Sequence, residues 1–295
     1  MSETRALELC GGLGNSWSDG LFLAIHGGEW EPEVRFSRTF VLKPAGEVVE
    51  VVDVLPESVE FCWYSEGSGT GYCPTRGGRI LLYGKGAWTE ETVCGYDDEF
   101  YLVGGLAGNN PDEDQVFLRG SNSLFVRKGG TWTEHRYSEA ALSALGMHAS
   151  APSELYLATA RGPALFDGSE FHAMEGPAPL RSVLVLGEDT LLAVGHEDLH
   201  LWQDDQGWTP LECPSSKLAV SCVQFAGDVY VGALDGPLRI RGTEVTRSSD
   251  FKCTTLVSMG DRLVGAGSSD GAWVLKDGTW LRLTLPEFEA GAKVP

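Results

Sequence analysis

The chain has 295 residues, enough for one or two domains, and 42% of them are hydrophobic, which excludes a disordered protein. Acidic residues outnumber basic residues by 42 to 22, for a formal net charge of −20. A field of this sign repels phosphate backbones and argues against nucleic acid as a partner. It favours a protein partner with a basic surface, or it serves solubility alone.

One phrase recurs along the chain: a short apolar run, a turn with glycine, an aromatic residue and a second β-prone run. The seven copies lie at residues 21–34, 80–92, 124–136, 164–174, 199–211, 238–248 and 272–283. Their anchor residues are Trp30, Trp88, Trp132, Phe171, Trp208, Val245 and Trp280. The anchors are about 42 residues apart on average, which is typical of a four-stranded propeller blade. The long first step, from Trp30 to Trp88, predicts an insertion around residues 35–80.

Two further apolar runs precede the phrase in the later units, as at residues 219–227 and 229–234. Each unit therefore contains four strands, A to D, and the D-strand aromatic is a natural wedge between neighbouring units. Radial stacking buries both faces of such short sheets. We predict an all-β chain whose residues 1–295 form a single β-propeller of seven four-stranded blades. Six blades are the second choice and a pair of β-sandwiches the third.

Closure of the ring is predicted from the two ends of the chain. Residues 6–12 fit strand B of the first unit, which leaves that unit without a strand A. The tail at residues 286–295 is the candidate for the missing strand.

The sequences SSDGAWVLKDGTW at 268–280 and ALDGPLRIRGTEV at 233–245 each follow a Gly-Asp turn. They resemble the degenerate repeats of bacterial β-propellers in the WD40, sialidase-like and YVTN-like range. The resemblance implies the architecture and no particular function. Paired Gly-His and Trp-Asp dipeptides and a complete S-x-D-x-G-x-x-W box are missing from the sequence.

The seven cysteines include no C-x-x-C pair, which argues against zinc knuckles and redox motifs. Their odd number favours a reducing compartment. The first residues lack the layout of a signal peptide, and no apolar run reaches the length of a membrane span. We therefore expect a cytoplasmic protein that does not bind membranes.

In propellers the loops that join strands B to C and D to A share one face, where ligands commonly bind. The predicted B–C loops include 13–20, 68–79 and 196–198. The partner-binding residues predicted on this face are Trp17, Asp19, Tyr72, Arg76, Arg119, Asn122, Arg161, His196, Glu197, Asp198, Asp235 and Asp270. Trp17 is either an exposed anchor for a partner or a residue folded back onto the first blade.

Two patterns raise the question of a metal. Residues 196–200 read His-Glu-Asp-Leu-His and match the zinc motif H-E-x-x-H, but that motif needs a helix and this segment is predicted to be strand–turn–strand. Residues 109–114 form the densest acidic cluster but lack calcium-loop spacing, so we interpret them as a solvated A–B loop. We predict no metal, no cofactor and no catalytic residue.

Three functions remain open. The first is a non-enzymatic protein-binding propeller, with an immunity or antitoxin protein that caps a cationic toxin as one version. The second is a hydrolase or lyase at the channel mouth, using Asp19, Asp235 or Asp270 with an arginine. The third is a carbohydrate-binding module with Trp17, Trp63 and Tyr72 as stacking platforms.

Overall fold

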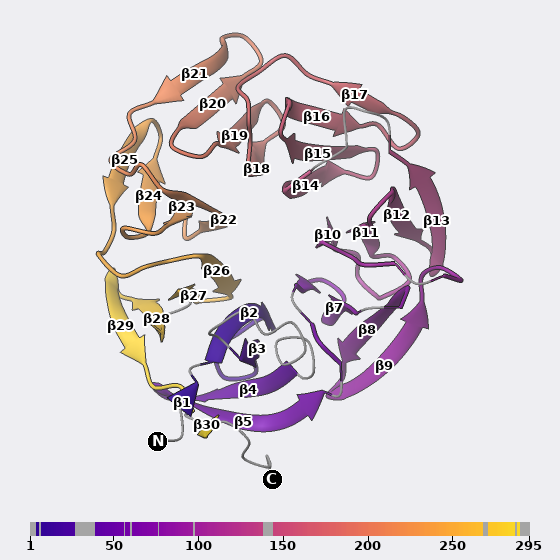
Figure 1. Ribbon diagram of the computed structural model, residues 1–295, viewed down its shortest axis with the longest axis vertical. Coiled ribbons are helices and arrows are strands. Elements are labelled where there is room, and N and C mark those ends of the chain that lie inside the picture. Colours follow the sequence, from indigo (N-terminus) through magenta and orange to yellow (C-terminus); the bar gives the residue numbers. More distant parts are fainter. Residues whose placement is uncertain are drawn as a thin grey trace.

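The computed structural model describes residues 4–5, 7–26, 39–55, 57–59, 61–75, 77–96, 98–137, 144–267, 271–286 and 288–289. Within these ranges the regular secondary structure is entirely β, as predicted. Seven antiparallel four-stranded sheets stand around a central axis, which confirms the seven-bladed propeller (Figure 1). The described part of the chain holds no helix long and apolar enough to cross a membrane.

Each blade runs in chain order from an innermost strand A to an outermost strand D (Figure 1). Blades 1 to 3 consist of β2 (Leu7–Leu13), β3 (Leu21–His26), β4 (Thr39–Ala45) and β5 (Val48–Leu55); β6 (Trp63–Ser65), β7 (Thr70–Pro74), β8 (Arg79–Gly84) and β9 (Ala87–Thr92); and β10 (Leu102–Leu106), β11 (Gln115–Arg119), β12 (Ser123–Lys128) and β13 (Thr131–Arg136). Blades 4 and 5 consist of β14 (Gly146–Ala151), β15 (Glu154–Thr159), β16 (Gly162–Phe166) and β17 (Phe171–Ala173); and β18 (Ser182–Gly187), β19 (Thr190–Val194), β20 (Leu199–Gln203) and β21 (Gly207–Leu211). Blades 6 and 7 consist of β22 (Leu218–Phe225), β23 (Asp228–Ala233), β24 (Leu238–Arg241) and β25 (Glu244–Arg247); and β26 (Thr255–Met259), β27 (Arg262–Gly267), β28 (Gly271–Lys276) and β29 (Thr279–Leu283).

Tight turns between strands C and D explain the glycine of the repeated phrase. Lys85 and Gly86 of blade 2 have φ values of 52° and 79°, and Asp277 and Gly278 of blade 7 have 49° and 78°. Positive φ at both central residues is the type I′ geometry, whose twist matches that of the paired strands. Glycine adopts it without the steric cost that a side chain brings.

The apolar core is divided among the contacts between neighbouring blades. One buried cluster lies between each adjacent pair; Phe22 and Phe40 of blade 1, for example, pack with Met259 of blade 7. The D-strand aromatics join these clusters: Trp88 packs between blades 1 and 2, and Trp280 between blades 6 and 7. The predicted role of these rings as wedges is thereby confirmed.

Two expectations for the first blade need correction. Residues 35–80 are not an insertion, because they contain strands β4 and β5 of blade 1 and strands β6 and β7 of blade 2. The error arose because residues 21–34 were interpreted as strands C and D, whereas β3 is strand B. Trp30 and its surroundings lie outside the described residues.

Ring closure also differs from the expectation. Strand A of blade 1 is β2, so the segment expected to be strand B is the innermost strand, and the part of the tail that the structure describes supplies no blade strand. Instead, β1 (Thr4–Arg5) pairs with β30 (Phe288–Glu289). Next to them, the amide of Val49 donates to Thr284 at 3.0 Å, and the amide of Thr284 donates to Glu47 at 3.0 Å. The chain after blade 7 is thus fastened to the outer edge of blade 1, where β1 and β30 lie (Figure 1).

Candidate functional site

The loops that join strands B to C and D to A define one face of the ring, here called the BC–DA face. The predicted residues that lie on its B–C side are Arg119, Asn122, Arg161, His196, Glu197, Asp198 and Asp235, so their placement on a shared face is confirmed. Arg76 and Asp270 lie outside the described residues. The opposite face, formed by the A–B and C–D turns, is the AB–CD face.

The predicted positions of Trp17, Asp19 and Tyr72 on the BC–DA face are wrong. Trp17 and Asp19 lie between β2 and β3, on the AB–CD face, because the first strand is strand A. The Trp17 ring packs edge-on against Phe22 at 5.7 Å and its Nε1 donates to Gly46 at 3.3 Å, so it folds back onto blade 1. Tyr72 is fully buried in β7, and residues 68–79 are no long loop because β7 and the start of β8 occupy half of them.

Large apolar side chains are exposed on the BC–DA face around blade 3. Tyr96 is 50% exposed, Tyr101 is 39% exposed and Leu145 is 49% exposed. All three belong to D–A loops that flank blade 3. None of the three was predicted, because the predicted site residues all come from segments assigned to B–C loops. Exposed aromatic and aliphatic side chains are typical of interaction surfaces, and here they extend from Tyr96, bonded to the outer strand β13, to Leu145 at the central channel.

The loop that carries the two tyrosines is fixed by a buried carboxylate. Asp98 accepts hydrogen bonds from the amide of Glu99 at 2.9 Å and the amide of Ser121 at 3.1 Å, which ties the D–A loop to the B–C loop of blade 3. The Tyr96 hydroxyl donates to Glu134 at 3.1 Å. Desolvation and this hydrogen bond raise the pKa of Tyr96 to about 12. Hydrogen bonds therefore tie Tyr96 to β13 and Asp98 to the B–C loop of blade 3.

Arg119, the last residue of β11, lies over the ring of the exposed Tyr101. Its guanidinium carbon is 4.9 Å from the centre of the Tyr101 ring. The Nε of Arg119 and the hydroxyl of Tyr137 are both buried without a hydrogen-bond partner among the described residues. Burial raises the pKa of Tyr137, and the charge of Arg119 acts against that rise. Two buried donors near Tyr101, the Nε of Arg119 and the hydroxyl of Tyr137, thus lack an acceptor among the described residues.

Asp235 has a structural environment. It accepts hydrogen bonds from the Ser215 hydroxyl at 2.5 Å and from Arg247 at 2.6 Å, and so connects two loops of the BC–DA face. Asp19 lies on the opposite face, so these two carboxylates do not converge as an acid–base pair. The exposed Arg161 lies in the B–C loop of blade 4, where its amide donates to Thr159 at 3.0 Å.

Residues 196–200 have the predicted strand–turn–strand conformation. The turn is closed by the amide of Gly195, which donates to Asp198 at 2.9 Å, and His200 is already in β20. The His200 ring contacts the Asp198 carboxylate at 3.0 Å. No group of three or more His, Cys, Asp or Glu side chains suited to a metal occurs in the described ranges.

The acidic loop at 109–114 is exposed at residues 109–113, as predicted for a solvated loop, but its last residue is a buried carboxylate on the AB–CD face. Asp114 is fully buried and accepts hydrogen bonds from Ser65 at 2.6 Å, Ser68 at 2.5 Å, Tyr72 at 2.7 Å and the amide of Gly108 at 2.8 Å. Burial and the hydrogen bond to Asp114 raise the pKa of Tyr72. With four donors already bound, this carboxylate is a structural element rather than a ligand site.

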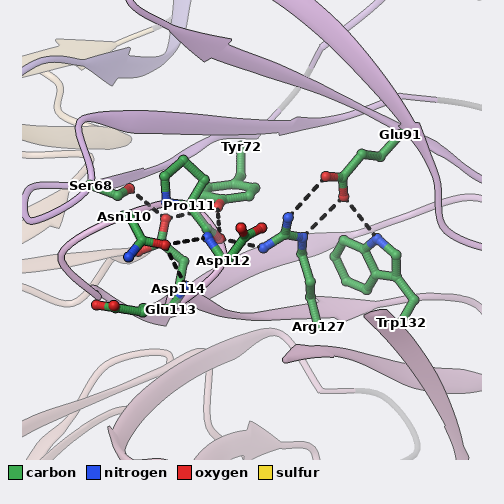
Figure 2. Close-up of polar contacts among 10 residues, drawn as sticks. All are labelled: Ser68, Tyr72, Glu91, Asn110, Pro111, Asp112, Glu113, Asp114, Arg127 and Trp132. Atoms are coloured by element: carbon green, nitrogen blue, oxygen red, sulfur yellow. Dashed lines mark hydrogen bonds and ion pairs between the residues drawn. The ribbon is translucent and has the colours of Figure 1, made fainter. Parts of the chain in front are cut away.

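Arg127 continues this network from blade 3 to blade 2 (Figure 2). Its side chain is almost fully buried and forms a bidentate pair with Glu91 at 2.9 and 3.0 Å. It also donates to the carbonyl of Pro111 at 2.5 Å, and Trp132 donates to Glu91 at 3.2 Å. Every charged group of the contact thus has a partner, and the network holds the two blades together.

The central channel, of about 810 Å³, is lined by the seven A strands. Glu66 is the single carboxylate among its lining residues, and burial lowers the pKa of the lining His148. Trp63 also lines the channel, whereas Tyr72 is buried and Trp17 lies on the AB–CD face. The three proposed sugar-stacking rings therefore do not share one surface.

Comparison with known proteins supports the fold. No protein-family model and no curated protein matches the sequence. The structure resembles the WD40 β-propeller domain of Doa1, with a TM-score of 0.65 and 10% identity over 91% of this chain and 93% of that one. It also resembles PorZ, an essential bacterial surface component of the type-IX secretion system of Porphyromonas gingivalis, with a TM-score of 0.68 and 12% identity over 99% of this chain and 40% of that one. The WD40 repeats of RRP9 match with a TM-score of 0.61 and 12% identity over 88% of this chain and 87% of that one. At these identities the likeness concerns the β-propeller fold alone.

Proposed function

We propose that this propeller is a protein-binding scaffold without catalysis and that its partner docks on the BC–DA face around blade 3. The observation that carries the proposal is the exposure of Tyr96, Tyr101 and Leu145 on one face, beside a stacked arginine. Tyrosine and arginine are enriched among the residues that dominate interface energetics. The rings are held by Asp98 and Glu134, so little order has to be created on binding.

The charge of the same face supports a basic partner. The exposed carboxylates on its loops are Glu99, Glu175, Glu197, Asp198, Glu212 and Asp250. The exposed cations on its described loops are Arg161 and Lys217, and the ends of the D strands add Arg136 and Arg247. An acidic surface accelerates the encounter with a basic protein and discriminates against acidic ones. An immunity or antitoxin protein that caps a cationic toxin is one version of this function. A toxin gene beside the gene for this chain would support that version.

Affinity capture with matched variants tests the proposal. The purified chain is immobilised and exposed to extract of the organism that makes it, at low salt. We expect a basic protein to bind the unaltered chain and to be lost at least about tenfold with the double variant Tyr96→Ser and Leu145→Ser.

The control is a double variant on the outer edge of blade 1, Val48→Ser and Val52→Ser. These side chains are 46% and 52% exposed, so the control removes similar exposed apolar surface away from the BC–DA face. The proposal fails if no partner is captured, or if both double variants weaken capture equally.

A further inference from the structure

We infer that Arg119, held on the ring of Tyr101, is a binding site for a single carboxylate presented by a neutral or basic segment of the partner protein. This inference rests on the proposed function, because it names the chemistry recognised within the same face. It adds an acidic group as a required feature of a partner whose remaining surface is basic.

Arg119 is held against Tyr101 by both its backbone and its side chain. Arg119 is the last residue of β11, and its carbonyl accepts a hydrogen bond from the amide of Tyr101 at 2.8 Å. The guanidinium lies over the ring of the same tyrosine at 4.9 Å. Backbone and side chain are thus both fixed relative to Tyr101. A stacked guanidinium that is already oriented loses little rotamer freedom when it binds a planar carboxylate.

The guanidinium of Arg119 lacks a counter-ion among the described residues. Within the described ranges the guanidinium of Arg119 makes no ion pair and no side-chain hydrogen bond, whereas Arg127 pairs with Glu91 and Arg247 pairs with Asp235. The nearby Asp98 directs Oδ1 to two backbone amides and forms no ion pair with Arg119. A partly desolvated guanidinium gains most from an acceptor that is itself charged.

The carboxylates near Tyr96 and Tyr101 disfavour a ligand that carries many negative charges. Glu99 lies in the same D–A loop as Tyr101, and Glu134 accepts the hydroxyl proton of Tyr96. A polyanion such as nucleic acid meets these carboxylates and is repelled. One carboxylate flanked by neutral or basic residues can reach Arg119 while its neighbours face Glu99 and Glu134. Charge complementarity therefore selects an isolated Asp or Glu side chain in a basic context.

Capped tripeptides test this assignment directly. The probes are acetyl-Lys-Glu-Lys-amide and its isostere acetyl-Lys-Gln-Lys-amide, with inorganic phosphate as a third ligand. The readout is the Nε–Hε signal of Arg119 in a proton–nitrogen NMR spectrum, identified by its loss in Arg119→Lys. We expect a saturable shift with the glutamate peptide and an affinity about tenfold lower for the glutamine peptide, as for loss of a charge-assisted bidentate contact.

Two variants guard against indirect effects. In Arg119→Gln, followed through the backbone amide signal of Tyr101, the difference between the two peptides should disappear, and the backbone spectrum of the other blades should stay unchanged. Arg161→Gln, which removes an exposed arginine from the same face, should keep that difference. Equal responses to both peptides, a phosphate response as strong as that of the glutamate peptide, or no saturable shift would each overturn the assignment.

The capture experiment separates this inference from the proposed function. If Arg119→Gln retains the captured partner and the Tyr96/Leu145 double variant loses it, the scaffold stands and the carboxylate site fails. If the glutamate peptide binds as expected but no partner is captured, the carboxylate site stands and the proposed function fails.

Discussion

Blade 3 contains two arginines that each lie beside a tyrosine ring, and the two sites differ in how their charges are matched. On the AB–CD side, Arg127 lies 5.8 Å from the centre of the Tyr72 ring, pairs with Glu91 and is almost fully buried. On the BC–DA side, Arg119 lies 4.9 Å from the centre of the Tyr101 ring without an ion pair among the described residues. The same pair of residue types thus serves two purposes.

The difference follows from what each arginine contacts. Arg127 pairs with Glu91 and packs on Tyr72, both of blade 2, so its ion pair joins two blades and raises the cost of separating them. Arg119 lies over Tyr101, in a loop that faces solvent, and its guanidinium has no ion-pair partner among the described residues. A fully paired network indicates a structural contact, whereas an oriented but unpaired cation indicates recognition.

The largest expected effect comes from breaking the paired side at Asp114. Asp114→Ala leaves the hydroxyls of Ser65, Ser68 and Tyr72 and the amide of Gly108 without their acceptor. Each buried unsatisfied group costs about 1–3 kcal/mol, so we expect the free energy of unfolding to fall by about 3–5 kcal/mol. Urea denaturation measures it. Asp112→Ala, in the exposed part of the same loop, should cost less than about 1 kcal/mol; similar losses in the two variants would contradict the structural role of Asp114.

Removal of Arg127 comes next. Arg127→Met keeps most of the side-chain volume but leaves Glu91 and the carbonyl of Pro111 without their donor. We expect a loss of about 2–3 kcal/mol, because Glu91 retains partial access to water. A double-mutant cycle with Glu91→Gln should give a coupling energy of at least about 1 kcal/mol. Additive single-mutant costs would show that the pair does not hold the blades together.

The same substitution on the unpaired side sharpens the comparison. Arg119→Met breaks no ion pair with a described residue and loses the contact with Tyr101, so we expect a change in unfolding free energy below about 1 kcal/mol. Measured under the conditions used for Arg127→Met, a loss as large for Arg119 would mean that both arginines are structural. The recognition role would then lose its main physical support.

The repeat architecture was predictable because its signals are local. Turn glycines such as Gly86 and Gly278 and D-strand rings such as Trp132 and Trp208 are set by a hairpin and its neighbouring blade. The strands of blade 1 were not identified from these signals, because its C–D hairpin, at Gly46, is followed by valines instead of an aromatic residue. The similar phrase that includes Trp30 was therefore taken for it.

The two sites of blade 3 were predictable to different degrees. Arg119 was found because a B–C loop follows from counting strands, but its neighbours Tyr101 and Tyr137 come from D–A loops at a distance along the chain. Asp114 was interpreted as solvated because its neighbours in the sequence are polar, apart from Pro111. Its burial results from donors that blade 2 supplies, Ser65, Ser68 and Tyr72, and composition carries no information about such contacts.

The smallest expected effect is a pH dependence on the unpaired side. The pKa of Tyr96 is about 12 in the folded chain against 10.0 for the free side chain, because desolvation and the hydrogen bond to Glu134 favour the protonated phenol. A raised pKa in the folded state gives stability that is complete below pH 10.0 and is lost as the pH rises towards about 12. Ultraviolet titration of the unaltered chain minus that of Tyr96→Phe isolates this phenol. Glu134→Gln removes the charged acceptor and should move its titration towards 10.0. If the difference titration has its midpoint at the ordinary value in the unaltered chain, Tyr96 is not held by Glu134, and the exposed patch is less ordered than the recognition role requires.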